Sequence, residues 1–63
     1  MPSPVRYAEV KAYIESGGWV LARINGSHHI FVRSGKRNIV IVVHGGKVKP
    51  AYVRQAKKII EGD

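Results

Sequence analysis

Three neighbouring residues in the middle of the sequence, Ser27, His28 and His29, could do chemistry. They follow Asn25-Gly26, a pair that joins two apolar runs and is typical of a two-residue β-hairpin turn. A histidine in a peptide has a pKa of ~6.5, so it can accept or donate a proton near neutrality. RNA carries its own nucleophile, the 2′-hydroxyl, and one histidine with a second proton-transfer group could cleave it without a metal ion. In the simpler alternative, the two histidines only contact phosphate or cap the hairpin.

The distribution of charge favours a polyanionic partner. The chain has 63 residues and a net charge of +7, and its four acidic residues, Glu9, Glu15, Glu61 and Asp63, lie near the ends. No carboxylate occurs from Ser16 to Ile60, where nine Lys and Arg residues occur. Nucleic acid is the commonest polyanion that such a field attracts. The alternative is a basic surface with no special partner.

The missing carboxylates exclude several kinds of catalytic site. A Mg²⁺-dependent nuclease needs acidic ligands, a glycosidase needs paired carboxylates, and a Ser-His-Asp triad needs its acid. A zinc site would need His28, His29 and His44 to converge, but alternation along a strand separates the first two. A domain this small has a marginal core and no room for a deep pocket. We therefore expect no metal and no small-molecule cofactor.

Composition predicts one domain over residues 1–63 in the cytoplasm, without membrane contact. No apolar run approaches the ~20 residues of a membrane helix. The first ten residues lack the apolar core of a signal peptide. The chain has no cysteine, which excludes disulfides.

Helix signals flank three strand-like runs. Ser3-Pro4 has the pattern of an N-cap followed by proline and predicts a helix from Pro4 to Ser16. A second helix is expected from Pro50 to Glu61, although Lys49 is a poor N-cap. Strands are predicted over residues 19–24, 28–33 and 38–43, with turns between them. The predicted fold is α+β, with a three-stranded antiparallel sheet that carries both helices on one face.

Turn geometry predicts a register for this sheet. A turn at Asn25-Gly26 would pair Arg23 with His28, and a turn at Gly35-Lys36 would pair Val32 with Ile39. The helix-covered face would then consist of Trp19, Leu21, Ile30, Val32, Ile39, Ile41 and Val43. The opposite face would hold Val20, Ala22, Phe31, Val40 and Val42 together with His29, Arg33 and Asn38. That face is too apolar for water and is expected to contact another protein.

The same register predicts the groups around His28. Arg23 would lie opposite it, where it either clamps phosphate or stays solvated. His44 is a possible second acid or base, although this register places it on the face of His29. The cations at the start and along the second helix should follow RNA phosphates; they are Lys49, Arg54, Lys57 and Lys58.

The run GGW-x3-R-x2-GSHHIF, residues 17–31, resembles the HicA toxins of bacterial and archaeal toxin–antitoxin systems. The later IVIVVHG segment and the closing basic helix are similar to that family too. The resemblance implies a small metal-independent endoribonuclease that cuts messenger RNA and has a fold like a double-stranded-RNA-binding domain. It also implies that His28, after Gly26-Ser27, is the catalytic histidine and that a HicB-like antitoxin is the protein partner.

Two segments depart from that family. Val42-Val43-His44 stands where Pro-x-His is frequent, and Ala51-Tyr52 stands where Gly-Thr is frequent. The Gly26-Ser27-His28 motif is intact, so we expect an active enzyme. The residues expected to contact RNA, besides the cations of the second helix, are Arg23, Gly26, Ser27 and His29. The competing classes are a non-catalytic RNA-binding module and a small basic ribosome-associated or DNA-binding protein.

Overall fold

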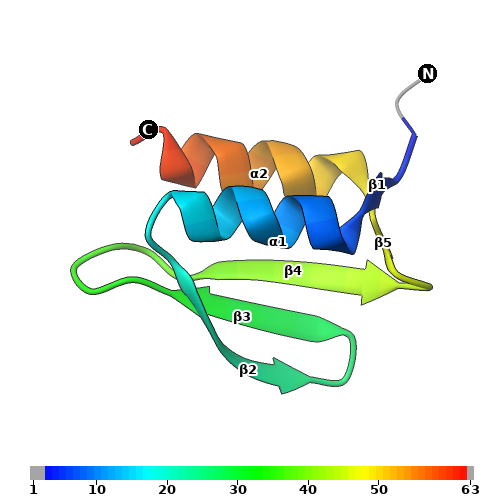
Figure 1. The fold of residues 1–63 in the computed structure, drawn as a ribbon, viewed down its shortest axis with the longest axis horizontal. Coiled ribbons are helices and arrows are strands. Elements are labelled where there is room, and N and C mark those ends of the chain that lie inside the picture. Colours follow the sequence, from blue (N-terminus) through cyan, green and yellow to red (C-terminus); the bar gives the residue numbers. More distant parts are fainter. Residues whose placement is uncertain (1–2, 63) are drawn as a thin grey trace.

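Two helices and a five-stranded antiparallel sheet make up the computed structural model, which describes residues 3–62. The elements in chain order are β1 (Val5–Arg6), α1 (Tyr7–Ser16), β2 (Val20–Asn25), β3 (His28–Val32), β4 (Ile39–His44), β5 (Lys47–Val48) and α2 (Pro50–Ile60). The strand order across the sheet is β1-β5-β4-β3-β2. Both helices run along the same side of β4, and β3 and β2 extend away from them (Figure 1). The α+β class is confirmed, but the sheet has two short strands more than predicted.

Strand pairing determines where α1 begins. α1 starts at Tyr7 rather than at Pro4, because the two residues before it form β1 and pair with β5. The Tyr7 N–H donates to the Gly46 carbonyl at 2.8 Å, which holds this junction on the sheet edge. Pairing at the sheet edge thus overrides the local capping signal. α2 starts at Pro50 as predicted, and no helix within residues 3–62 is long and apolar enough to cross a membrane.

The first hairpin turns at Gly26-Ser27, one residue later than predicted. Asn25 lies opposite His28, and Arg23 lies opposite Ile30. Gly26 has a φ of 62°, whereas no non-glycine residue in the described range has a positive φ. These angles fit a type II′ turn, in which glycine comes first. The predicted pairing of Arg23 with His28 is therefore wrong.

The second register is also shifted, and the shift reverses the two faces of β3. Phe31 pairs with Ile39, where the sequence predicted Val32. A shift of one residue moves every side chain of a strand to the other face. Phe31 and His29 therefore face the helices, while Ile30 and Val32 face away. We call the surface facing away from the core the outer face. It includes Val20, Arg23, Asn25, His28, Ile30, Val32, Val40, Val42 and His44.

The core fills the space between the helices and the other face of the sheet. Its fully or almost fully buried side chains are Val10, Ile14, Trp19, Phe31, Ile39, Ile41, Val48 and Ala56. The Trp19 Nε1–H donates to the Arg37 carbonyl at 2.8 Å, and the Arg33 guanidinium lies 5.2 Å from the Trp19 ring centroid. Arg33 also donates to the Gly17 carbonyl. Trp19 thereby anchors the turn after α1 to the loop before β4.

We predict that Phe31→Ala destabilises the domain far more than Val40→Ala. Phe31 is 0% exposed, and loss of a buried ring costs about 3–5 kcal/mol, comparable with the whole stability of a small domain. Val40 lies on the outer face and is 45% exposed, so its truncation should cost less than about 1 kcal/mol. Urea unfolding followed by circular dichroism measures both. Equal losses would contradict the register of β3.

Candidate active site on the outer face

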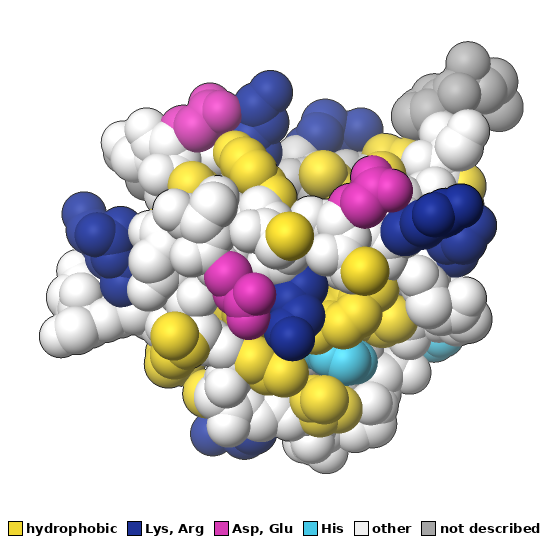
Figure 2. All heavy atoms as spheres, viewed as in Figure 1, with side chains coloured by type: hydrophobic (Ala, Val, Ile, Leu, Met, Phe, Trp, Pro, Cys, Tyr) yellow, Lys and Arg dark blue, Asp and Glu magenta, His cyan; other side chains and the backbone are white. Residues whose placement is uncertain are grey.

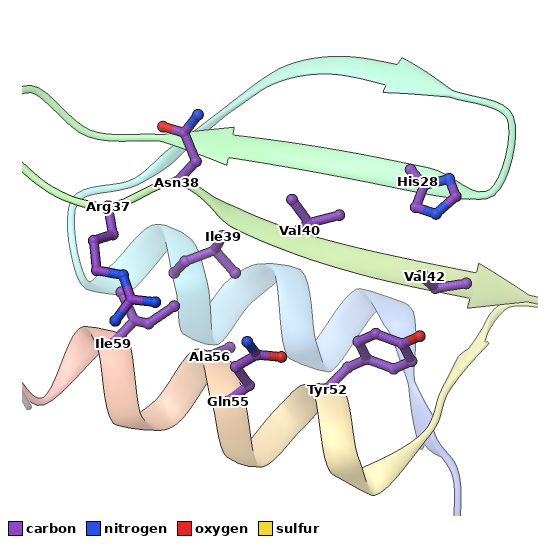
Figure 3. Close-up of a pocket in the computed structure, with 10 residues that line it drawn as sticks. All are labelled: His28, Arg37, Asn38, Ile39, Val40, Val42, Tyr52, Gln55, Ala56 and Ile59. Atoms are coloured by element: carbon purple, nitrogen blue, oxygen red, sulfur yellow. The ribbon is translucent and has the colours of Figure 1, made fainter.

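His28 is the first residue of β3 and is exposed on the outer face. Val42 lies opposite it on β4. One residue earlier, the Ser27 carbonyl accepts a hydrogen bond from the Val43 N–H at 2.9 Å. This bond ties the hairpin turn to the end of β4. The backbone of His28 is therefore held beside Val42 on β4 (Figure 3).

His29 supports the fold on the opposite side of the sheet. Its Nδ1 and the Tyr7 hydroxyl oxygen are hydrogen-bonded at 2.8 Å, and the two ring centroids are 4.5 Å apart. Burial, and then the nearby charge of Glu15, raises the pKa of Tyr7 above its ordinary value of 10.0, so the phenol keeps its proton at neutral pH. His29 is half-buried and turned away from His28. It does not share a surface with the expected catalytic histidine.

His44 lies on the same face as His28, which corrects the sequence prediction. Val42 is directly opposite His28, and His44 follows two residues later on the same strand, so both side chains point the same way. Diagonal neighbours of this kind are roughly 7–8 Å apart in an antiparallel pair. Both histidines are exposed. The predicted separation of these histidines came from the inverted register of β3.

Arg23 shares the outer face with His28 but occupies a diagonal position. Asn25 takes the position directly opposite His28. Gly26 is exposed at the hairpin tip, and a Cβ there would meet nothing within 4 Å, so its positive φ rather than crowding favours glycine. Ser27 is half-buried beside it. Arg23, Gly26 and Ser27 therefore surround the end of β3 that carries His28.

Two adjoining hollows flank these histidines. The first, of about 290 Å³, lies between β4 and α2, and we call it the β4–α2 groove. It is lined by His28, Arg37, Asn38, Ile39, Val40, Val42, Tyr52, Gln55, Ala56 and Ile59 (Figure 3). The second, of about 180 Å³, we call the lysine hollow; it is lined by Pro4, Val42, His44, Lys47, Lys49 and Tyr52. Val42 and Tyr52 belong to both hollows and form the boundary between them.

One side of α2 forms a wall of the groove. Tyr52, Gln55 and Ile59 recur at helical spacing and line it together, while Ala56 is buried at its base. Figure 3 shows the Tyr52 and Gln55 side chains between α2 and β4. The site residues expected from the sequence include neither Tyr52 nor Gln55, because only the cations of this helix were expected to contact RNA. The spacing of Tyr52, Gln55 and Ile59 is the signal that could have identified this wall.

None of the cations of α2 lines the groove. At about 100° per residue, Lys57 lies about 200° after Gln55 and points to nearly the opposite side of the helix. Lys57 and Lys58 are in the last turn, where a positive charge is favoured by the helix dipole. The helix dipole therefore accounts for these two lysines without any contact with RNA. Lys49, just before α2, differs because it lines the lysine hollow.

No acidic side chain lines either hollow. The carboxylates in residues 3–62 are Glu9 and Glu15 on α1 and Glu61 after α2. In Figure 2 the acidic side chains lie over the helices, and the strand region below shows none. Within residues 3–62, no three His, Asp or Glu side chains come close enough to hold a metal ion. The site therefore offers imidazoles, amides, a phenol and ammonium groups to a ligand.

A family comparison covers almost the whole chain. The model described as HicA toxin of bacterial toxin–antitoxin systems matches residues 7–61, from the first residue of α1 to the residue after α2. No curated protein matches the chain. The observed order of helix, strands and helix is compatible with a fold like a double-stranded-RNA-binding domain. The chain belongs to the HicA toxin family.

Proposed function

We propose that this toxin is an endoribonuclease that cuts messenger RNA without a metal ion, with His28 as a catalytic residue. The observation that carries the proposal is the exposed His28 at the mouth of a groove, with His44 on the same face and no carboxylate near either. The family match supports a toxin, and the donor set of the site supports the chemistry. Because the proposed substrate is messenger RNA, the reaction would take place in the cytoplasm.

In the proposed reaction, the RNA supplies the nucleophile. Neutral His28 takes the proton of a 2′-hydroxyl, and the 2′-oxygen attacks the adjacent phosphorus. The P–O5′ bond breaks, and protonated His44 gives its proton to the leaving O5′. The products are a 2′,3′-cyclic phosphate and a 5′-hydroxyl, so atoms and charge balance. The diagonal placement of the two imidazoles leaves room for one phosphate group between them.

Cations around the two histidines would stabilise the crowded phosphate. Lys47 and Lys49 line the lysine hollow beside His44. Arg23 lies on β2, in the position diagonal to His28. Positive groups aimed at developing negative charge lower the barrier to phosphoryl transfer. Lys49 and Arg23 are thus the stronger candidates among the cations expected to bind RNA. Arg54, Lys57 and Lys58 would act at longer range through the overall positive field.

A HicB-like antitoxin is the proposed protein partner. The outer face exposes apolar side chains, with Val20 59% and Val40 45% exposed. Exposed apolar surface next to a positive site suits an acidic partner that would cover both. The surface expected from the sequence included Phe31, which lies in the core instead. The proposed interface is therefore the side of the sheet that carries Val20, Val40 and Val42.

We predict that His28→Ala lowers RNA cleavage at least about a hundredfold, the low end of the contribution of general acid–base catalysis. Folding should persist because the ring is exposed, and RNA binding should persist because the cations remain. Cleavage of a single-stranded RNA in EDTA, read on a denaturing gel, measures the loss. A substrate with a 2′-deoxy sugar at the cut site should be inert. Full activity of the variant would exclude His28 as a catalytic residue, and cleavage of the deoxy substrate would exclude attack by the 2′-hydroxyl.

The pH dependence of cleavage should identify the proton donor. If His44 protonates O5′, the pH dependence of kcat/KM should be bell-shaped, and His44→Gln should remove the limb on which activity falls as pH rises. Activity at neutral pH should drop at least about a hundredfold, again the low end of what general acid–base catalysis contributes. His29→Gln is the matched control, since its ring faces α1 and should leave both limbs in place. A profile that keeps both limbs in His44→Gln would assign the second proton transfer to another group.

Removing single charges should distinguish the cation near the site from one on the far side of α2. Lys49→Gln should weaken binding of single-stranded RNA and reduce the log–log salt slope by about 0.7, the value for one phosphate contact. Lys57→Gln removes the same charge from a position that faces away from the groove, so its effect on the slope should be smaller. Fluorescence anisotropy at several salt concentrations measures both slopes. Equal changes would place RNA along the whole of α2.

A further inference from the structure

We propose that the β4–α2 groove is a nucleobase subsite in which the Gln55 amide reads the edge of one base beside the scissile phosphate. The inference rests on the proposed function for its substrate, RNA. It adds a specificity-determining residue and a base preference to that function. Tyr52, at the boundary with the lysine hollow, would mark where the base ends and the sugar-phosphate backbone begins.

The groove has the chemistry of a site for a flat, neutral ring. Its middle is aliphatic, from Val40 and Val42 on one side and Ala56 and Ile59 on the other, and Arg37 and Asn38 line one end. Proteins that recognise single-stranded RNA bind unstacked bases against apolar or aromatic side chains and read their edges by hydrogen bonds. A hollow of about 290 Å³ lies at the small end of the range for ligand pockets, which suits one base.

Gln55 is the polar group placed to read such a base. Its side chain extends from α2 into the groove, between Ile59 and Tyr52 (Figure 3). No hydrogen bond joins its amide to another residue in the range 3–62. An amide presents a donor and an acceptor side by side, and a base edge presents the complementary pair. The amide is therefore available for a ligand.

The separation of charge between the two hollows orients the RNA. The lysine hollow holds Lys47 and Lys49 beside His44. The one Lys or Arg that lines the groove is Arg37, which lies beside Ile59 at the end away from Tyr52 (Figure 3). A phosphate is favoured in the first and an uncharged base in the second. Val42 and Tyr52 lie where the hollows meet, and His28 lines the groove directly opposite Val42. A nucleotide with its base in the groove therefore brings its 2′-hydroxyl and phosphate toward His28.

Binding of four matched oligonucleotides tests the proposal on the full chain. The oligonucleotides are five nucleotides long, differ only in the central base, and are 2′-O-methylated throughout so that none can be cut. We expect one base to bind at least about fivefold more tightly than the weakest, the low end for one bidentate amide–base pair. Gln55→Leu, which keeps the size of the side chain but has no amide, should reduce that ratio to near one. Its urea unfolding curve should match that of the parent chain, because Gln55 is exposed.

Lys49→Gln serves as the control, because loss of a phosphate contact should lower the four affinities by a common factor and leave their ratio unchanged. Equal affinities for all four bases in the parent chain, or a preference that survives in Gln55→Leu, would overturn the inference. Cleavage of unmodified RNA, assayed in parallel, tests the proposed function separately. A base preference without cleavage would support the nucleobase subsite and contradict the endoribonuclease activity. Cleavage without a base preference would support the activity and contradict the subsite.

Discussion

The register of β3 against β4 is the constraint on which the rest of the molecule depends. Phe31 is fully buried opposite Ile39, and strand alternation then determines the direction of every other side chain in β3. His29 must point toward α1, where Tyr7 meets it, and His28 must point to the outer face. The packing of one aromatic ring thus assigns a structural role to one histidine and exposes the other.

Helix α2 separates the core from the site. Ala56 is buried, and its small side chain lets the helix approach β4 closely. One flank of α2 supports the core, and the other carries Tyr52 and Gln55 along the groove. The cations occupy the remaining, solvent-facing side. A single helix can serve these purposes because residues about 100° apart on its surface meet different surroundings.

The chemistry available to this domain follows from its size and charge. The core of a 63-residue domain is small, and the strands carry no carboxylate among the described residues. The proposed cleavage of RNA through its own 2′-hydroxyl needs no carboxylate. The same shortage of carboxylates leaves a surface of high positive charge. That charge would draw in RNA and would equally favour an acidic protein that keeps the toxin inactive.

Local signals in the sequence were sufficient for much of the fold. The β-branched run of β4, the glycine-containing hairpin and Pro50 at the start of α2 each act within a few residues, so the α+β class and most elements could be predicted. The sequence also marked His28 as a candidate, since its motif lies within one hairpin. The start of α1 and the strands β1 and β5 could not be predicted, because they depend on pairing between residues far apart in the chain.

Only the tertiary structure decided which residues share a surface with His28. The turn at Gly26-Ser27 and the longer loop before β4 shifted both registers, and a shift of one residue exchanged the faces of β3. That exchange placed Phe31 in the core and brought His44 to the face of His28. Tyr52 and Gln55 joined the site because α2 packs beside β4, a contact that no local pattern specifies. The sequence by itself determined the chemical groups, and long-range packing determined their arrangement.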